Sequence, residues 1–140
     1  MLFPKKVKYR RVQRMRRNPD KVRNASRGTE VNFGEYGMKA LTPAYLRSNQ
    51  IEAARRVISR TIGKTGRLWI RVFPDRPWTQ KAAEVGMGKG KGDPQGFEVR
   101  VLPGRILFEV SGVSTDVARN AIIKASKKLP LRAAFSVKRT

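Results

Sequence analysis

The residues best suited to chemistry in this sequence are the glycines and lysines of the segment 87–92, MGKGKG. Glycine-rich loops cradle phosphates, but the Walker pattern needs GxxxxGK followed by Ser or Thr. The spacing from Gly86 to Gly90 is one residue too short, and Gly92 follows Lys91 where the hydroxyl is required. The dinucleotide pattern GxGxxG also fails, because the glycines recur at every second residue. Two cations on a chain of little bulk instead favour close approach to a polyanion.

No catalytic residues are predicted. The sequence contains no cysteine and no histidine, which excludes thiolate nucleophiles and zinc sites built from these residues. The ten acidic residues are scattered along the sequence. Glu98 and Glu109 could lie on one sheet face, where each is expected to form a surface ion pair with a nearby arginine rather than a catalytic pair. We therefore expect no metal, no cofactor and no small-molecule substrate.

The charge of the chain points to a polyanionic partner. In 140 residues, 32 Lys and Arg face 10 Asp and Glu, a formal net charge of +22. Self-repulsion of this size is naturally compensated by nucleic acid. No apolar run approaches the roughly 18 residues of a membrane span, and the N-terminus lacks the apolar run of a secretory signal, although an arginine-rich organelle transit peptide stays open.

The basic residues are densest in residues 1–28, where Asp20 is the only acid. Apolar residues there are too scattered for a core, so we interpret this segment as an N-terminal arm and residues 29–140 as a single domain. The arm either threads between RNA phosphates or remains a solvated extension that aids solubility. Arginine, which binds phosphate bidentately, favours the first interpretation. Residues 82–94 are predicted to form a mobile Gly/Lys loop within the domain.

A strand is predicted over residues 67–73, because its side chains alternate. One face is apolar and the other interleaves arginines with aromatics: Leu68, Ile70 and Val72 against Arg67, Trp69, Arg71 and Phe73. The second face suits nucleic acid, where guanidinium groups bind phosphates and rings stack on bases. Pro74 and Pro77 are expected to end the strand.

Two amphipathic helices are predicted, at 49–63 and 114–129. The first is capped by Asn49, or by Ser48, and the second by Ser114 or Thr115. Each has one apolar stripe: Ile51, Ala54, Val57, Ile58 and Ile62 in the first helix, and Val117, Ala118, Ala121, Ile122, Ala125 and Leu129 in the second. On the far side of the first helix, Arg56, Arg60 and Lys64 recur every four residues with Arg55 beside them. No acid is expected to neutralise this row, which favours a phosphate-facing ridge over a solvated face.

The remaining strands complete an α+β fold. One or two short strands are expected in 29–41, a hairpin over 97–102 and 106–110 turning at Pro103-Gly104, and a closing strand at 133–138. The helices can cover one face of the sheet. We therefore predict a two-layer sandwich, a mainly antiparallel sheet of about five strands with two helices on one face, plus the basic arm.

Several of these motifs stand in order along the chain: 50–56 (QIEAARR), 69–75 (WIRVFPD), 87–92 (MGKGKG), 103–109 (PGRILFE) and 128–130 (KLP), after Met1-Leu2 and Pro4-Lys5. Together they closely resemble the bacterial-type large-subunit ribosomal protein sixteen family over essentially the whole chain. The resemblance implies a structural component of the cytoplasmic ribosome, with an organelle ribosome not excluded. It also implies a place among helices of large-subunit (23S-type) rRNA, near the aminoacyl-tRNA site and the peptidyl transferase centre, and late incorporation during assembly.

The sequence departs from that family in two places. Gly86 stands where many relatives have an arginine before Met-Gly, so the loop depends on its lysines for charge. The arm around 18–23 is also longer than in common relatives.

Residues and resemblance together indicate two groups of contacts. Those expected at rRNA are Lys5, Lys6, Lys8, Arg10, Arg11, Arg14, Arg16, Arg17, Arg55, Arg56, Arg60, Lys64, Trp69 and Arg71. Those expected at the A-site tRNA, with the P-site tRNA as a further candidate, are Lys81, Met87, Lys89 and Lys91. Trp69 is either a stacking platform or a lid over the core edge. Neighbouring ribosomal proteins are also expected partners. The alternatives are a free-standing RNA- or DNA-binding regulator, and an enzyme acting on RNA, for which the sequence offers no acid pair or metal site.

Overall fold

The structure is a computed structural model that describes residues 2–140; Met1, which contributes to the resemblance above, lies outside the described residues. The described part contains seven strands, two α-helices and one short 3-10 turn. In chain order these are a 3-10 helix Pro19–Lys21, β1 Tyr36–Ala40, β2 Ala44–Arg47, α1 Ser48–Ile62, β3 Arg67–Ile70, β4 Arg76–Gln80, β5 Asp93–Val101, β6 Ile106–Ser111, α2 Thr115–Ser126 and β7 Ala133–Val137.

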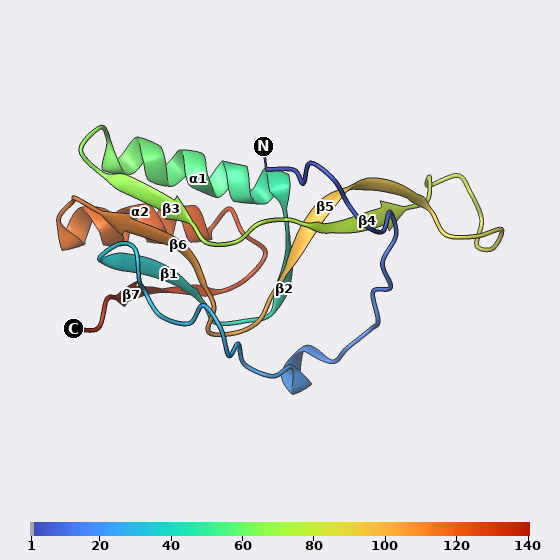
Figure 1. Cartoon of the computed structure of the whole chain (residues 1–140), viewed down its shortest axis with the longest axis horizontal. Coiled ribbons are helices and arrows are strands. Elements are labelled where there is room, and N and C mark those ends of the chain that lie inside the picture. The colour runs from blue at the N-terminus through green and yellow to red at the C-terminus, as the bar shows by residue number, and fades with distance from the viewer. Residues whose placement is uncertain (1) are drawn as a thin grey trace.

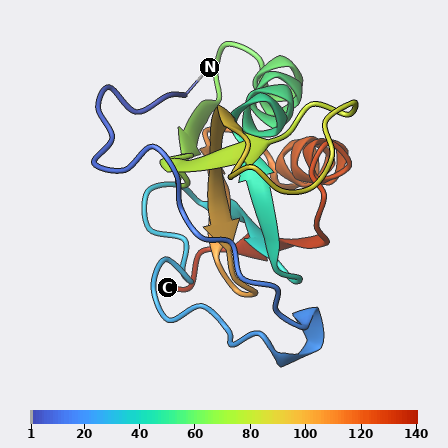
Figure 2. The ribbon, with the colours of Figure 1, turned by 90° about the vertical axis from the view of Figure 1, so that its right-hand side faces the viewer.

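The strands form two antiparallel sheets (Figure 1). The larger has the order β3-β6-β1-β7 and the smaller β2-β5-β4. The two helices pack against each other on one side of the strands, as the view in Figure 2 shows. The α+β class with two covering helices is confirmed. The strands differ from the expected arrangement in being seven, divided between two sheets.

The division into two sheets begins at Pro103-Gly104, where a hairpin was predicted. The tight turn exists, since Arg105 N donates to Leu102 O at 3.3 Å, but β5 pairs with β2 and β4 while β6 pairs with β1 and β3. Gly104 has a φ of +97° after the proline, as in a type II turn. Such a turn splays the flanking strands because its twist opposes theirs. The hairpin prediction is therefore wrong.

The helices bury the apolar stripes that the sequence predicts. In α1 the buried residues include Ile51, Ala54, Ile58 and Ile62, with Val57 partly buried, and in α2 they are Ala118, Ala121, Ile122 and Ala125. Val117 is instead exposed, and Leu129 is buried just beyond the end of α2. The buried residues of both helices share one hydrophobic core with fully buried residues of β1 and β6, among them Met38 and Phe108.

The helix starts are only partly as predicted. Ser114 caps α2, its Oγ accepting from Val117 N at 3.5 Å, as expected. The N-cap of α1 is Arg47 rather than Asn49 or Ser48; the Gln50 side chain reaches back to accept from Arg47 N at 2.9 Å. This satisfies one of the orphan donors of the first turn without a capping side chain on the N-cap residue.

Two strands, β2 and β4, were not predicted. β4 contains Pro77, which the sequence suggested would end a strand. Proline is tolerated on an edge strand because its missing N–H leaves no central ladder bond unmade, and β4 lies at the edge of its sheet. Regular pairing in β3 ends at Ile70, but the predicted alternation continues to Val72, which is 3% exposed.

Candidate nucleic-acid interface

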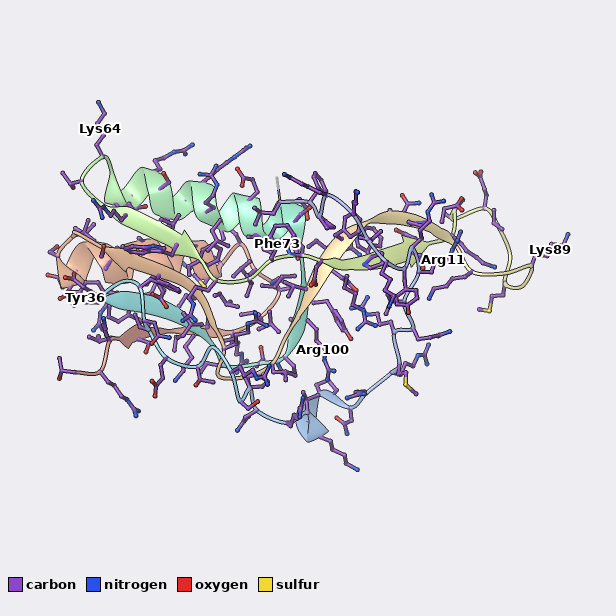
Figure 3. The ribbon with its side chains drawn as sticks, in the orientation of Figure 1. Arg11, Tyr36, Lys64, Phe73, Lys89 and Arg100 are labelled. Carbon is purple, nitrogen blue, oxygen red and sulfur yellow. The ribbon has the colours of Figure 1, made fainter. Side chains whose placement is uncertain are left out.

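The glycine-lysine loop joins β4 and β5 and projects beyond the rest of the molecule (Figure 1). Gly88 and Gly90, with φ of +100° and +95°, flank Lys89 with φ +58°. Three consecutive left-handed residues make a tip that only a glycine-rich sequence adopts without large strain. Met87 is fully exposed, and Lys89 points away from the body at the far end (Figure 3).

Of the predicted tRNA-contacting lysines, two hold the loop in place and one is free of such a bond in the described part of the chain. Lys81 Nζ donates to Gly88 O across the loop. Lys91 Nζ donates to Val12 O of the arm at 2.7 Å. Lys89 Nζ makes no hydrogen bond to another of residues 2–140, so of these three lysines it is the one most available to a partner.

The N-terminal arm runs alongside the three-stranded sheet and the base of the loop (Figure 1). Arg11 donates to Gly92 O at 3.3 Å and lies 3.5 Å from the Asp93 carboxylate. Arg14 stacks 3.9 Å above the Tyr45 ring and lies 3.9 Å from Glu98. Thus two of the predicted rRNA contacts also fasten the arm to the sheet. The other arm cations predicted to bind rRNA are exposed and make no ion pair in the described structure: Lys5, Lys6, Lys8, Arg10, Arg16 and Arg17.

On α1, the expectation that no acid neutralises the basic row is wrong. Glu52 accepts two hydrogen bonds from Arg55, at 2.9 and 2.5 Å, and one from Arg56 at 3.3 Å. The bidentate Arg55 contact, aided by its charge and that of Arg56, lowers the pKa of Glu52 to about 2. Arg60 and Lys64 lie beyond the reach of Glu52 and are exposed, so the open part of the ridge is its C-terminal half.

Arg71, the strand arginine predicted to hold rRNA, is largely committed inside the protein. It donates to Glu109 Oε1 at 2.8 Å and to Glu30 O at 2.7 Å, and its side chain is 16% exposed. The Glu109 carboxylate is fully buried and also accepts from the backbone N–H groups of residues 32–34. Burial by itself raises the pKa of Glu109, but the hydrogen bonds from Gly34, Asn32, Arg71 and Phe33 outweigh it and bring the pKa below its ordinary value.

The sequence suggested that Glu98 and Glu109 form surface ion pairs on one sheet face, and this prediction is wrong. Glu109 lies on β6 of the larger sheet and Glu98 on β5 of the smaller, and both are buried. The reason is the division of the strands into two sheets, which separates the carboxylates and covers each with a different segment. Trp69, on β3, is half-buried and lines an open cavity of about 740 Å³ between the sheets, as does Arg71 just beyond the strand.

Other features of a catalytic or membrane protein are not found in residues 2–140. No group of three or more acidic side chains there could hold a metal ion. Neither helix in that part of the chain is long and apolar enough to cross a bilayer. The basic surfaces are thus the distinguishing feature of the molecule.

Comparison with known proteins shows which family the chain belongs to. The model of the family Ribosomal protein L16p/L10e matches residues 4–136. The chain belongs to this ribosomal protein family. It is 50% identical to the large ribosomal subunit protein uL16 of Leifsonia xyli subsp. xyli over 95% of its length and 93% of that protein. It is also 50% identical to that of Azobacteroides pseudotrichonymphae genomovar. CFP2, over 99% of this chain and 94% of the relative.

Membership confirms the family resemblance seen in the sequence, and with it a structural role rather than an enzymatic one. The sequence analysis nonetheless did not include several arginines of this ribosomal protein among the candidate binding residues. Arg47 stacks 3.8 Å from the Trp78 ring and Arg76 lies 5.4 Å from the Tyr45 ring. The available signal was the pairing of arginines with aromatics in 44–47 and 76–80, the same pattern that marks 67–73. Arg100 and Arg105, beside Trp69 in the intersheet cavity, carried no such signal.

Proposed function

We propose that this ribosomal protein is a structural constituent of the large ribosomal subunit, that it binds large-subunit rRNA near the aminoacyl-tRNA site and peptidyl transferase centre, and that its loop helps to position tRNA. The two relatives are both named for the large subunit. A net charge of +22 needs a partner that absorbs it, and folded rRNA supplies such a partner.

The observation that carries the proposal is the distribution of exposed cations along the long axis. Lys64, at the end of α1, and Lys89, at the loop tip, lie at opposite ends of the molecule (Figure 3). Between them runs the arm, where six of the predicted rRNA-binding cations are exposed and lie outside the ion pairs of the described structure. A protein with cations spread along its whole length suits a site between several rRNA helices, because phosphate contacts fix position without reading sequence.

In this proposal the rRNA contacts come in two sets. The arm supplies the first set, and α1, β3 and the residues just after each supply the second: Arg55, Arg56, Arg60, Lys64, Trp69 and Arg71. Within the second set Arg60 and Lys64 contribute most, since the others are held by Glu52 or Glu109 or are half-buried. An arm that lies between rRNA helices requires those helices to have folded first, which supports late incorporation during assembly.

The tRNA contact is assigned to the loop tip. Lys89 and Met87 are exposed there, while Lys81 and Lys91 maintain the shape of the loop. The loop acts by electrostatic positioning of the tRNA rather than by reacting with it, because its exposed tip offers the charge of Lys89. Without arginine at Gly86, Lys89 carries the free charge of the tip.

The decisive experiment is sedimentation of a cell lysate in low salt with detection of this chain. We expect it to co-sediment with large subunits, whereas recovery mainly at the top of the gradient would refute the proposal. For the loop, large subunits carrying Lys89→Ala should bind A-site tRNA more weakly than those carrying Lys124→Ala, an exposed lysine on α2 that matches it in charge. Equal tRNA binding by the two would remove the loop from the proposal.

A further inference from the structure

A groove between the two sheets has the composition of a nucleotide site. We call it the intersheet groove and define it by the aromatic residues Phe33, Trp69 and Phe73 and the arginines Arg100 and Arg105, all of which line the cavity of about 740 Å³. This volume lies within the roughly 300–1,000 Å³ typical of small-molecule sites. It therefore has room for one nucleotide.

The aromatic side chains of the groove are unusually open. Phe33 is 62% exposed and Phe73 is 44% exposed, while Trp69 is half-buried between them and the core. Scattered exposed apolar residues are normal, but two exposed rings and a tryptophan around one cavity indicate a surface that something covers. Flat rings suit a flat partner, and every nucleobase has a face that can stack on them.

The arginines of the groove indicate that the partner is anionic. Of the five ion pairs in the described structure, none includes Arg100 or Arg105, and no hydrogen bond of either side chain is found there. Arg71 and Arg76 also line the groove but already bind within the chain, Arg71 to Glu109 and Arg76 to Gln13 O. Asp75 is the only acid in the lining, so the groove has a clear positive excess.

We propose that the intersheet groove holds one unstacked nucleotide of RNA, with its base against Trp69 and Phe73 and its phosphate at Arg100 and Arg105. Proteins recognise single-stranded RNA in this way, by stacking splayed bases on rings while cations hold the backbone. The charge of the groove disfavours a basic segment of a neighbouring protein. The inference rests on the proposed rRNA binding and specifies one of its contacts.

The first test uses tryptophan fluorescence. The chain has two tryptophans, so Trp78→Phe leaves Trp69 as the only one. An unstructured RNA hexanucleotide should quench Trp69 emission in this variant, because a stacked base quenches the ring. Heparin, a polyanion without bases, should bind but leave the emission nearly unchanged. Equal quenching by heparin and RNA, or no quenching by RNA that binds, would overturn the inference.

The second test compares groove variants with a matched control. Phe73→Ala should weaken hexanucleotide binding roughly tenfold, equivalent to about 1.4 kcal/mol. The double variant Arg100→Ala/Arg105→Ala should lower the slope of log affinity against log salt by about 0.7 per arginine. Lys124→Ala/Lys127→Ala removes the same charge from exposed positions at the end of α2 and should leave Trp69 quenching intact.

A third measurement does not depend on the isolated chain. In large subunits carrying Phe73→Ala, chemical probing of the rRNA should show one unpaired base that becomes more reactive than in subunits with the lysine control. If the wild-type chain enters large subunits and the groove variants give the control pattern, the groove inference is refuted while the proposed function stands. If the wild-type chain fails to enter large subunits, both are refuted.

Discussion

Two regions of this ribosomal protein are held together by different interactions. The helix-covered region, made of α1, α2 and the β3-β6-β1-β7 sheet, has a continuous apolar interior. Met38, Phe108, Val110 and Ile51 are fully buried there. Burying such side chains contributes about 1.5–3 kcal/mol each, a term that salt affects little.

In the arm-and-loop region, residues 2–28 and 76–97, antiparallel pairing of β4 with β5 supports the loop, and long cationic side chains fasten the arm to it. Lys91 and Arg11 donate to backbone carbonyls across the contact between arm and loop, and Arg14 stacks on Tyr45. Exposed contacts of this kind contribute about 0–1 kcal/mol each and weaken with salt. The helix-covered region therefore supplies most of the stability, whereas the arm-and-loop region supplies exposed binding groups and adds little stability.

The largest expected effect is loss of the apolar interior. Phe108→Ala, at a fully buried ring of β6, should lower the free energy of unfolding by about 3–5 kcal/mol, because it removes buried surface and leaves a cavity. The matched change in the other region is Val85→Ala in the loop, 56% exposed, which should stay within about 0.5 kcal/mol. Denaturant unfolding measures both, and equal losses would contradict the division into two regions.

The second expected effect concerns the buried carboxylate of the helix-covered region. Glu109→Gln should cost about 2 kcal/mol at neutral pH, because it removes charge-assisted hydrogen bonds to Arg71 and to residues 32–34. The pKa of Glu109 is lowered in the folded state. Its contribution is therefore present above the unfolded value, about 4.3, and is lost as pH falls through the lower folded value.

Unfolding by urea at pH 7 and pH 3 provides the measurement. The difference in stability between wild type and Glu109→Gln should shrink at the lower pH, where the carboxyl group begins to protonate. Glu84→Gln, an exposed loop residue outside the ion pairs found in the described structure, serves as the control and should match wild type at both pH values. A constant gap between wild type and Glu109→Gln would show that ionisation of Glu109 does not stabilise the fold.

Several predictions that depend on nearby residues succeeded in this sequence, although the Asn49 or Ser48 cap, the burial of Val117 and the unneutralised α1 row did not. The stripes of both helices and the Ser114 cap follow from spacings of three and four residues, and the structure contains them. The exposed Lys89 at a glycine-rich tip was also predictable, since no neighbouring residue could cover it. In each case the cause lies within one turn or one loop.

Predictions that depend on distant segments failed. Pro77 is compatible with β4 only because that strand lies at a sheet edge, which the sequence does not reveal. Burial of Glu109 requires residues 32–34, more than 70 positions earlier, to fold over it. Docking of the arm by Arg14 on Tyr45 likewise requires β2, which was not predicted.

A smaller effect is expected from Glu52→Gln. The change removes a partly exposed pair and should cost under about 1 kcal/mol at neutral pH. Because the pKa of Glu52 is lowered to about 2, this contribution exists above about pH 4.3 and disappears as pH falls towards 2.

The same Glu52→Gln change frees Arg55 and Arg56, which should strengthen binding to an rRNA fragment and steepen the salt dependence of that binding. Asp116→Asn, an exposed acid on α2, is the control for a general charge effect; an equal gain in affinity there would contradict release of the ridge.

The smallest effect on stability, and the sharpest test of how the arm is held, is Lys91→Ala. It removes the 2.7 Å bond to Val12 O while leaving every buried residue untouched, so the free energy of unfolding should change by less than about 0.5 kcal/mol. Hydrogen exchange of the arm near Val12 should nonetheless accelerate, because its carbonyl loses a charged donor. Lys89→Ala deletes the same charge from the loop tip without that bond, so it should leave exchange in the arm unchanged. Both variants lower the net charge equally. Faster exchange in only the Lys91 variant would therefore show that the hydrogen bond to Val12 O holds the arm. Equal exchange in both variants would mean that overall electrostatics hold the arm instead.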